Sequence, residues 1–572
     1  MTIQPGNVLC PDFIGFGAQG DCQLRCPVNA GRGVDEQDIK GVFNKIRAMR
    51  PHVIRTFFAY QWWEPEEGRQ TRNSAYMRDY VEYLKFLKSI GCKVNLTPWG
   101  DWFSYSRWMK PDPDSRMPSG NKRRAMIRSL VDLVDYLWRD KGLTNVSQLT
   151  LMNEPDNSKR APNPEDFVEL NKMLEEELKA RGLRDQIFMV GVDGSGWSEA
   201  KPGDWFYDVL AVGGADYFDG AAAHTYGQNF DCATLIPWVE TRTQALGRYG
   251  YPAKPFMITE FGSFGSTRGG IFTMSDNDKY EYGLFLARFA LIALRHKTAN
   301  VLMWCLFDTY YDTMNKQECG LLRWKDEGWM PRPGYYSWSL LTRYTRPGSR
   351  VVNVDYADSA DETSIPSVAL LSPRNELTFL AVNSHTKPVV IHLKAGVGDV
   401  ALDYFEYSNK MAPTEDHEMI RASATIQFKA NEPAAVTLPA QSFIVLTNVE
   451  QNVRQWAREI LALEKMKLPF YTPDRALVIA PDADTAWQLR EMIKKGKPEF
   501  RVITFASAAA DYDNPVPLPD NWTMKHMIGA VTNAYVIEPG KGYPADVLRD
   551  FDLVKKGSIY LVRPSNRDRE PY

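Results

Sequence analysis

Short β-rich apolar runs alternate with amphipathic helical patterns between residues 12 and 307, and this alternation limits the folds open to the chain. Eight such runs are predicted as strands: Phe13–Gly17, Val53–Phe58, Lys93–Trp99, Gln148–Asn153, Ile187–Val192, Tyr217–His224, Pro255–Glu260 and Val301–Leu306. Alternating strands and helices are typical of a parallel sheet whose crossover helices cover it. Eight units over about 300 residues predict a (β/α)8 TIM barrel.

The alternative to a closed barrel is an open, doubly wound parallel sheet. Such sheets commonly bind dinucleotides through a Gly-x-Gly-x-x-Gly turn after the first strand. Here Gly15-Phe16-Gly17 lacks both the third glycine and a helix directly after it. The barrel is therefore the preferred prediction, and no nucleotide cofactor is indicated.

The pattern of the sequence changes twice after the barrel. Residues 346–450 show alternating strands and turn signals without helices, which predicts a β-sandwich. Residues 451–572 mix helical and β-like runs, which predicts a small α/β module. Residues 1–345 are assigned to the barrel, and its first dozen residues are candidates for an additional strand of the sandwich.

Charge and composition exclude several classes of protein. The 68 basic and 71 acidic residues nearly cancel, so the chain lacks the excess of positive charge expected of a nucleic-acid binder. No apolar run is long enough to cross a membrane, and the first residues do not resemble a signal peptide. We therefore expect a cytoplasmic protein as the sequence is written, or a secreted one if a signal has been removed. The seven cysteines and seven histidines do not fall at ligand spacing, so no metal is expected.

Residues that follow the predicted strands are candidates for an active site, because the carboxyl ends of the strands carry the site in such barrels. The candidates are Arg55, Trp63, Trp99, Trp102, Asn153, Glu154, His224, Tyr226, Glu260 and Trp304. Glu154 and Glu260 follow the fourth and seventh strands, which lie roughly opposite each other in a barrel. Two facing carboxyl groups are the minimum equipment for glycoside hydrolysis.

The motifs at these strand ends resemble those of glycoside hydrolase clan A. Leu-Thr-Leu-Met-Asn-Glu-Pro at 149–155 resembles the Asn-Glu-Pro motif of the fourth strand, and Met-Ile-Thr-Glu-Phe-Gly at 257–262 resembles the nucleophile motif of the seventh. The other matching positions are Arg55, His224, Tyr226 and Trp304. A histidine found after the third strand in the cellulase-type family is missing here, so no member family or substrate is assigned.

The resemblance implies a role for each matching residue. Glu154 would be the acid/base, and Glu260 the nucleophile that forms a covalent glycosyl-enzyme. Asn153 would bind the 2-hydroxyl of the sugar, while Arg55 and Tyr226 would keep Glu260 ionised and aligned. Retention of anomeric configuration is implied, with the carboxyl groups about 5–5.5 Å apart.

The remaining candidates are mostly aromatic. The resemblance implies that His224 orients the acid/base or contacts substrate, and that Trp304 forms the floor of the sugar subsite. Trp63, Trp99 and Trp102 are further candidates for stacking on sugar rings, since flat apolar rings suit the faces of sugars. Core packing is the competing explanation for each of these tryptophans.

The sequence therefore predicts a retaining glycosidase that acts on an oligo- or polysaccharide, with β-linkages favoured. The alternatives are a transglycosylase that uses the same residues and a barrel that binds carbohydrate without catalysis. The expected partner is a carbohydrate substrate, with neither nucleic acid nor membrane. The mechanism requires no cofactor. Residues 451–572 are a candidate for homo-oligomer formation.

Overall fold

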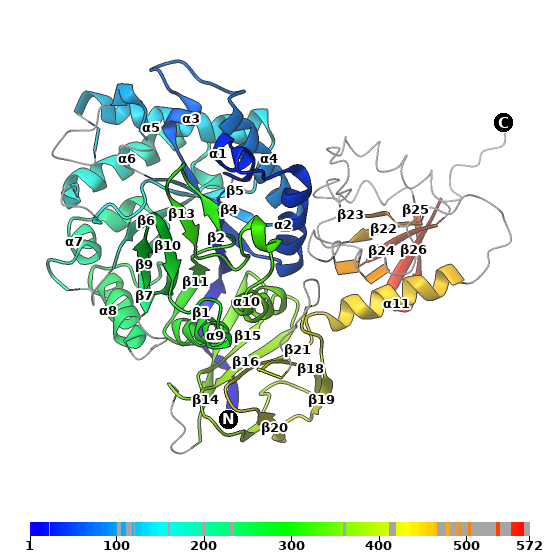
Figure 1. Ribbon diagram of the computed structural model, residues 1–572. Coiled ribbons are helices and arrows are strands. Elements are labelled where there is room, and N and C mark those ends of the chain that lie inside the picture. Colours follow the sequence, from blue (N-terminus) through cyan, green and yellow to red (C-terminus); the bar gives the residue numbers. More distant parts are fainter. Residues whose placement is uncertain are drawn as a thin grey trace, which may run out of the picture. The chain divides into compact units, whose positions relative to one another are not determined.

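A computed structural model describes most of the chain (Figure 1). The described residues are 1–21, 23–99, 105–109, 117–118, 120–157, 161–196, 201–227, 234–357, 362–410, 419–465, 476–480, 485, 488–489, 492–493, 501–504, 533–537 and 551–564. Residues 1–447 and residues 448–572 belong to different compact units, apart from residues 89–91, which group with the second. Each unit is described by itself.

Eight parallel strands close into a barrel in the first unit, as Figure 1 shows. Around the barrel they are β2 (Gly15–Gln19), β3 (Val53–Phe58), β4 (Lys93–Pro98), β5 (Val146–Thr150), β6 (Phe188–Gly194), β7 (Gly220–Gly227), β8 (Phe256–Ser263) and β11 (Thr298–Met303). Strand β11 pairs with both β8 and β2, which closes the ring. The predicted (β/α)8 barrel is confirmed, and the open-sheet alternative is wrong.

Helices surround the barrel strands (Figure 1). They are α1 (Pro27–Gly31), α2 (Glu36–Met49), α3 (Tyr60–Trp63), α4 (Ala75–Ser89), α5 (Gly120–Asp135), α6 (Pro164–Ala180), α7 (Trp205–Ala211), α8 (Leu235–Arg248), α9 (Tyr280–Arg295) and α10 (Pro333–Tyr344). Local chemistry sets several helix starts. Asp35 caps α2 by accepting from two backbone N–H groups, and Asn163 caps α6 directly before a proline.

Helix α10 covers the seam at which the barrel closes. Its fully buried Trp338 donates its indole N–H to the backbone oxygen of Gly17 on β2, at 3.0 Å. The same ring packs against Phe16 and Phe261, which come from β2 and β8. A side chain at Gly17 would place its Cβ 1.7 Å from the backbone oxygen of Val53, so only glycine fits this close approach.

The β-sandwich prediction is also confirmed. Its larger sheet has seven strands in the order β1 (Thr2–Phe13), β14 (Ser349–Asp355), β15 (Ser367–Leu371), β16 (Leu377–Asn383), β21 (Ser442–Thr447), β18 (Val400–Tyr407) and β19 (Ala424–Phe428). A second sheet pairs β17 (Val389–Leu393) with β20 (Ala434–Leu438). Side chains from both sheets share one hydrophobic core. The first strand, β1, pairs with β14 and so belongs to the sandwich.

Helix α9 joins the barrel to the sandwich. Arg295 donates to the backbone oxygens of Val354 and Ser367, and Tyr280 stacks on Tyr407 with ring centroids 4.8 Å apart. These contacts tie the two parts of the first unit together through partly buried polar and aromatic groups.

The second unit contains a helix and a five-stranded mixed sheet, so the predicted α/β module is confirmed. The helix is α11 (Gln451–Lys465), and the sheet order is β23 (Arg501–Thr504), β22 (Ala476–Ala480), β24 (Asn533–Ile537), β26 (Ile559–Pro564) and β25 (Phe551–Lys556). Val453, Trp456 and Ile460 of the helix share a core with Val478 and Tyr535 of the sheet.

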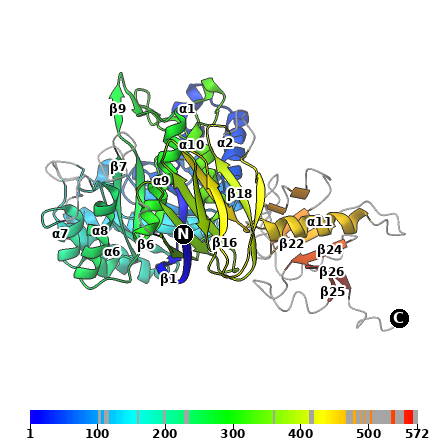
Figure 2. The same ribbon diagram turned by 90° about the horizontal axis from the view of Figure 1, so that it is seen from below.

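A small sheet lies in the segments that follow β8 and β11. Its strands are β12 (Thr309–Tyr310), β13 (Lys316–Glu318), β10 (Ile271–Met274) and β9 (Gly265–Arg268). Figure 2 shows β9 standing out from the body of the barrel. Because these segments leave the carboxyl ends of the strands, the small sheet marks the end of the barrel at which the candidate site lies.

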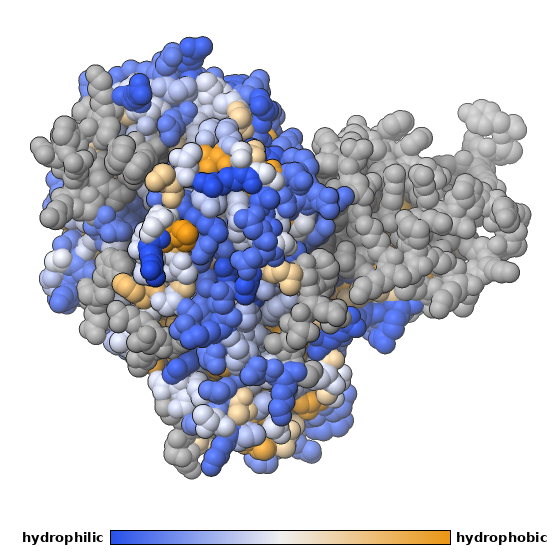
Figure 3. All heavy atoms as spheres, viewed as in Figure 1, coloured by the Kyte–Doolittle hydropathy of each residue, from blue (hydrophilic) through white to orange (hydrophobic). Residues whose placement is uncertain are grey.

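Hydrophilic residues dominate the described part of the surface that Figure 3 shows, with small scattered hydrophobic spots. None of the described helices combines the length and the apolar character needed to span a bilayer.

Candidate active site

Charged side chains from five strands meet inside the carboxyl end of the barrel. Arg55 comes from β3, Glu154 follows β5, Asp193 lies on β6, His224 on β7 and Glu260 on β8. Arg55, Asp193 and His224 are completely buried or nearly so, whereas 14% of the Glu154 side chain and 8% of the Glu260 side chain are exposed. Glu154 is therefore the most accessible charged group of the cluster.

The Arg55 guanidinium binds four oxygen atoms. One terminal nitrogen donates to Gln19 at 2.9 Å and to Oε2 of Glu260 at 3.2 Å. The other donates to Oδ1 of Asn153 at 2.6 Å and to Oδ2 of Asp193 at 2.7 Å. The rigid planar fork of arginine thus fixes side chains from four strand ends in one arrangement.

The His224 ring lies between three carboxyl groups. Its Nδ1 is 3.0 Å from Oε1 of Glu154 and 3.5 Å from Oε2 of Glu260, and its Nε2 is 3.1 Å from Oδ1 of Asp193. Asn157 donates to the second oxygen of Glu154 at 2.6 Å. Both glutamates therefore face the same nitrogen of one imidazole ring.

Glu260 also has a neutral donor besides the Arg55 cation. The Tyr226 hydroxyl donates to its Oε1, while Arg55 holds Oε2. One carboxylate oxygen of Glu154, one of Glu260 and a ring nitrogen of His224 all lie within 4.8 Å of one another. The structure thus brings together six residues singled out from the sequence: Arg55, Asn153, Glu154, His224, Tyr226 and Glu260.

The environments push the pKa values of the two glutamates apart. Burial favours the neutral form of Glu154, but the hydrogen bond and charge of His224, with Asn157 and Arg55, outweigh it and lower the pKa. Burial raises the pKa of Glu260, and the charge of Glu154 adds to this effect despite His224, Arg55 and Tyr226. A proton shared between His224 and Glu154 therefore resides on His224.

Burial alone would lower the pKa of His224, but the charges of Asp193 and Glu260 and the hydrogen bonds to Asp193 and Glu154 raise it to about 10. In the unfolded chain a histidine has a pKa of about 6.5. The stabilisation from this proton is therefore complete below about pH 6.5 and is lost as the pH rises towards 10.

We expect the free energy of unfolding to fall between pH 6.5 and 10, by at most about 1.4 kcal/mol per pH unit from this group. Denaturant unfolding at a series of pH values measures it. A His224→Gln variant should lack this component, whereas His392→Gln, at an exposed position on β17, should keep it. Equal pH dependence in the wild type and the His224→Gln variant would contradict the expectation.

The tryptophans predicted to bind substrate fall into three groups. Trp304 and Trp99 belong to one aromatic cluster with Phe57 and Tyr226, beside the charged residues. Trp63 is a correction: its ring is fully buried, and its indole N–H donates to the backbone oxygen of Ser129 on α5. It is a core residue and cannot reach a substrate here. Trp102 lies outside the described residues.

Three residues of the site were missed in the sequence. Asp193 bonds to Arg55, His224 and Thr259, and Gln19 accepts from Arg55. Asp21 is buried beside them and accepts from Gln19 and from the hydroxyl of Tyr311. All three lie at or just beyond a barrel strand, so a scan of every strand end would have found their positions, though not the direction of the Asp193 side chain.

Glu154, His224 and Glu260 are close enough together to hold a metal ion in principle. The ring of His224, however, is engaged at both nitrogens by carboxylates, and its raised pKa favours the protonated form. A metal ligand must be the neutral imidazole. A metal ion at this position would therefore have to displace the proton of His224, which the carboxylates on both sides of the ring stabilise.

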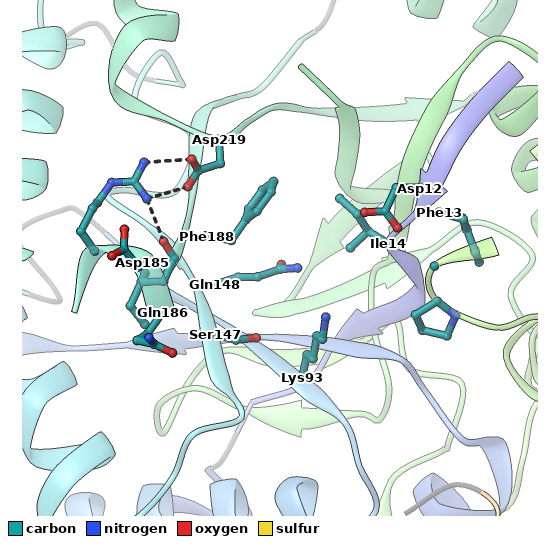
Figure 4. Close-up of a pocket in the computed structure, with 14 residues that line it drawn as sticks. Asp12, Phe13, Ile14, Lys93, Ser147, Gln148, Asp185, Gln186, Phe188 and Asp219 are labelled. Carbon is teal, nitrogen blue, oxygen red and sulfur yellow. Dashed lines mark hydrogen bonds and ion pairs between the residues drawn. The ribbon is translucent and has the colours of Figure 1, made fainter. Parts of the chain in front are cut away.

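A cavity of about 530 Å³ lies at the opposite end of the barrel (Figure 4). It is lined by the first residues of several strands, among them Lys93, Ser147 and Phe188, and by the ion pair between Arg184 and Asp219. Because chemistry in such barrels takes place at the carboxyl ends of the strands, this cavity is separate from the candidate site.

Comparisons with solved structures find glycoside hydrolases. They include a GH30 endoxylanase from Clostridium papyrosolvens (15% identity, TM-score 0.55), an endo-β-1,6-glucanase (17%, 0.54) and a family 51 α-L-arabinofuranosidase from Bifidobacterium longum (12%, 0.52). Each match covers 78% of this chain and, in the same order, 99%, 94% and 97% of the other. No protein-family profile matches the sequence, and no curated protein matches it significantly. The predicted resemblance is confirmed at the level of the fold.

Proposed function

We propose that this protein is a retaining glycoside hydrolase that cleaves O-glycosidic bonds, with β-linkages favoured, in an oligo- or polysaccharide. The observation that carries the proposal is the pair Glu154 and Glu260, with carboxylate oxygens within 4.8 Å of each other at the carboxyl end of the barrel. Retaining enzymes hold their two carboxyl groups about 5–5.5 Å apart, whereas inverting enzymes need about 6.5–9.5 Å to admit a water molecule.

Glu260 is the nucleophile in this mechanism. Its oxygens are held by Tyr226 and Arg55, which leaves the carboxylate in a fixed orientation for attack on the anomeric carbon. The bond from that carbon to the leaving oxygen breaks as the bond to Glu260 forms. The covalent intermediate is then hydrolysed by water.

Glu154 is the acid/base. It protonates the leaving oxygen in the first step and removes a proton from the attacking water in the second. Glu154 is more exposed than Glu260, and it lies on the opposite side of His224 from Asp193. Such a position suits a group that must contact both the leaving group and the attacking water.

The lowered pKa of Glu154 is at first sight unfavourable for an acid. Its neighbour His224 resolves this difficulty, because a protonated ring nitrogen 3.0 Å from Oε1 supplies the missing proton. His224 and Glu154 therefore share one transferable proton. The pKa at which this proton is lost is a property of the pair and not of either residue alone.

Two further contacts support a sugar ligand. Asn153, with its oxygen fixed by Arg55, is positioned to meet a sugar hydroxyl beside the attacked carbon. Trp304 and the half-buried Trp99 offer apolar faces next to Tyr226, against which a sugar ring can pack.

A screen of nitrophenyl glycosides, followed by polysaccharides, tests the proposal. We expect hydrolysis of at least one glycoside, with NMR of the first product showing the anomeric configuration of the substrate. Reactions with and without added acceptor sugars separate hydrolysis from transglycosylation. Release of the opposite anomer, or no turnover of any glycoside, would contradict the proposal.

A further inference from the structure

Asp193 is a third carboxylate of the cluster, and it is closed to substrate because only 1% of its side chain is exposed. Its Oδ2 accepts from Arg55 at 2.7 Å, and its Oδ1 accepts from the hydroxyl of Thr259 at 2.5 Å and faces Nε2 of His224 at 3.1 Å. Its backbone oxygen accepts from the N–H of Glu154 at 3.0 Å. Asp193 thus contacts His224 through its carboxylate and Glu154 through its backbone oxygen.

The backbone at this point is strained. Val192 and Asp193 have φ angles of 64° and 49°, in the left-handed region that residues with a Cβ rarely adopt. The pairing of β6 with β7 shifts register between Val192 and Gly194, as in a β-bulge. A bulge redirects a side chain, and strain of this kind persists where a site requires the geometry. The result here is a carboxylate aimed at His224.

The charged groups that face His224 are Asp193, Glu154 and Glu260, and Arg55 binds two of these carboxylates. With a carboxylate on each side, both ring nitrogens are placed to donate: Nε2 to Asp193 and Nδ1 to Glu154. Without Asp193, the ring would face its two carboxylates from one side only, and Nε2 would lose its partner.

We propose that Asp193 is a positioning residue that keeps His224 doubly protonated, so that the proton used by Glu154 is held on Nδ1 of His224. This inference rests on the function proposed above. In the first step the Nδ1–H bond breaks and the Oε1–H bond of Glu154 forms, which leaves both groups neutral. The leaving oxygen then takes this proton, and Glu154 returns to the carboxylate.

Loss of the negative charge on Glu260, as its bond to the sugar forms, weakens the attraction that holds the proton on the ring. Proton transfer from His224 to Glu154 is thereby favoured in the same step in which Glu154 must act as the acid. In the second step the proton that Glu154 takes from water returns to Nδ1, and the starting charges are restored.

NMR of the ring nitrogens in the full-length protein tests the proposal without any substrate. The chain has seven histidines, and a His224→Gln variant identifies the signal of this one. We expect both nitrogens of His224 to be protonated at pH 7 in the wild type. In Asp193→Asn, which keeps the size but removes the charge, the titration should move down by at least about one pH unit.

Asp156→Asn is the matched control. Asp156 is another partly enclosed carboxylate near Glu154, but it bonds to Ser195 rather than to His224. Its variant should leave the titration of His224 in place. A neutral ring at pH 7 in the wild type would overturn the proposal even if the Asp193→Asn variant failed to fold. So would an unchanged titration in a folded Asp193→Asn variant.

Kinetics form the second arm of the test. With a glycoside found in the screen, the alkaline limb of kcat/KM in the Asp193→Asn variant should move to lower pH by the same amount as the His224 titration. A merely structural role would lower the rate without moving the limb, and that result would overturn the proposal. Absence of any glycosidase activity would contradict the proposed function, while the NMR result would still decide the role of Asp193.

Discussion

Replacing Glu260 with alanine should reduce glycoside turnover by at least about 10⁴-fold, equivalent to about 5.5 kcal/mol of transition-state stabilisation. The variant loses the atom that attacks the anomeric carbon, while the cluster keeps Arg55, Asp193 and His224. Initial rates on the best substrate of the screen measure the effect, and circular dichroism checks the fold. Turnover close to that of the wild type would contradict the assignment of Glu260 as nucleophile.

Azide separates the roles of the two glutamates. In Glu260→Ala, azide enters the space of the missing carboxylate and should give a glycosyl azide of opposite anomeric configuration. In Glu154→Ala, the covalent intermediate still forms, so azide should give the same configuration as the substrate. Glu318→Ala is the matched control: this glutamate of β13 pairs with Lys316 in the small sheet, and its variant should keep turnover near the wild-type level.

Replacing Arg55 with alanine should lower the free energy of unfolding by about 3–5 kcal/mol. The guanidinium is completely buried, and its removal takes one of two neighbouring cations from Asp193 and Glu260 and one donor each from Gln19 and Asn153. Unfolding in guanidinium chloride near pH 7 measures the loss.

The control for Arg55 is Arg123→Ala. Arg123 also makes two bonds to a carboxylate, that of Asp166, but the pair is solvent-accessible and its loss should cost about 1 kcal/mol or less. A loss for Arg55→Ala no larger than that of the control would contradict the view that Arg55 neutralises the buried cluster. Arg55→Lys should recover only part of the stability, because a point charge cannot bind four oxygens at once.

The strand pattern of the sequence was sufficient to predict the barrel, because the apolar β-rich runs between helical patterns correspond to the barrel strands. Each predicted run contains at least half of a barrel strand, although several bounds differ. The run Gln148–Asn153, for example, corresponds to β5 at Val146–Thr150, since the chain leaves the sheet before its apolar run ends. The position of Glu154 relative to Glu260 follows from strand order alone, which is why motif spacing was informative.

Two features of the site could not be read from the sequence. The side chain of Asp193 turns into the barrel through a bulge with positive φ angles at two non-glycine residues, and residue identity does not reveal such a backbone. The direction of Trp63 depends on the short helix α3, which turns the ring onto α5 instead of towards the site. In both cases the error concerns where a side chain points rather than where its strand lies.

The pairing of β1 with β14 has a consequence for the order in which the protein is made. Phe13 pairs with Ser349, so the first strand leaves the ribosome about 340 residues before its partner does. At about 5–20 residues per second, that interval is roughly 15–70 seconds. Throughout this time β1 lacks the neighbouring strand with which it pairs in the sheet. The seven-stranded sheet of the sandwich can therefore be completed only after the whole barrel has been synthesised.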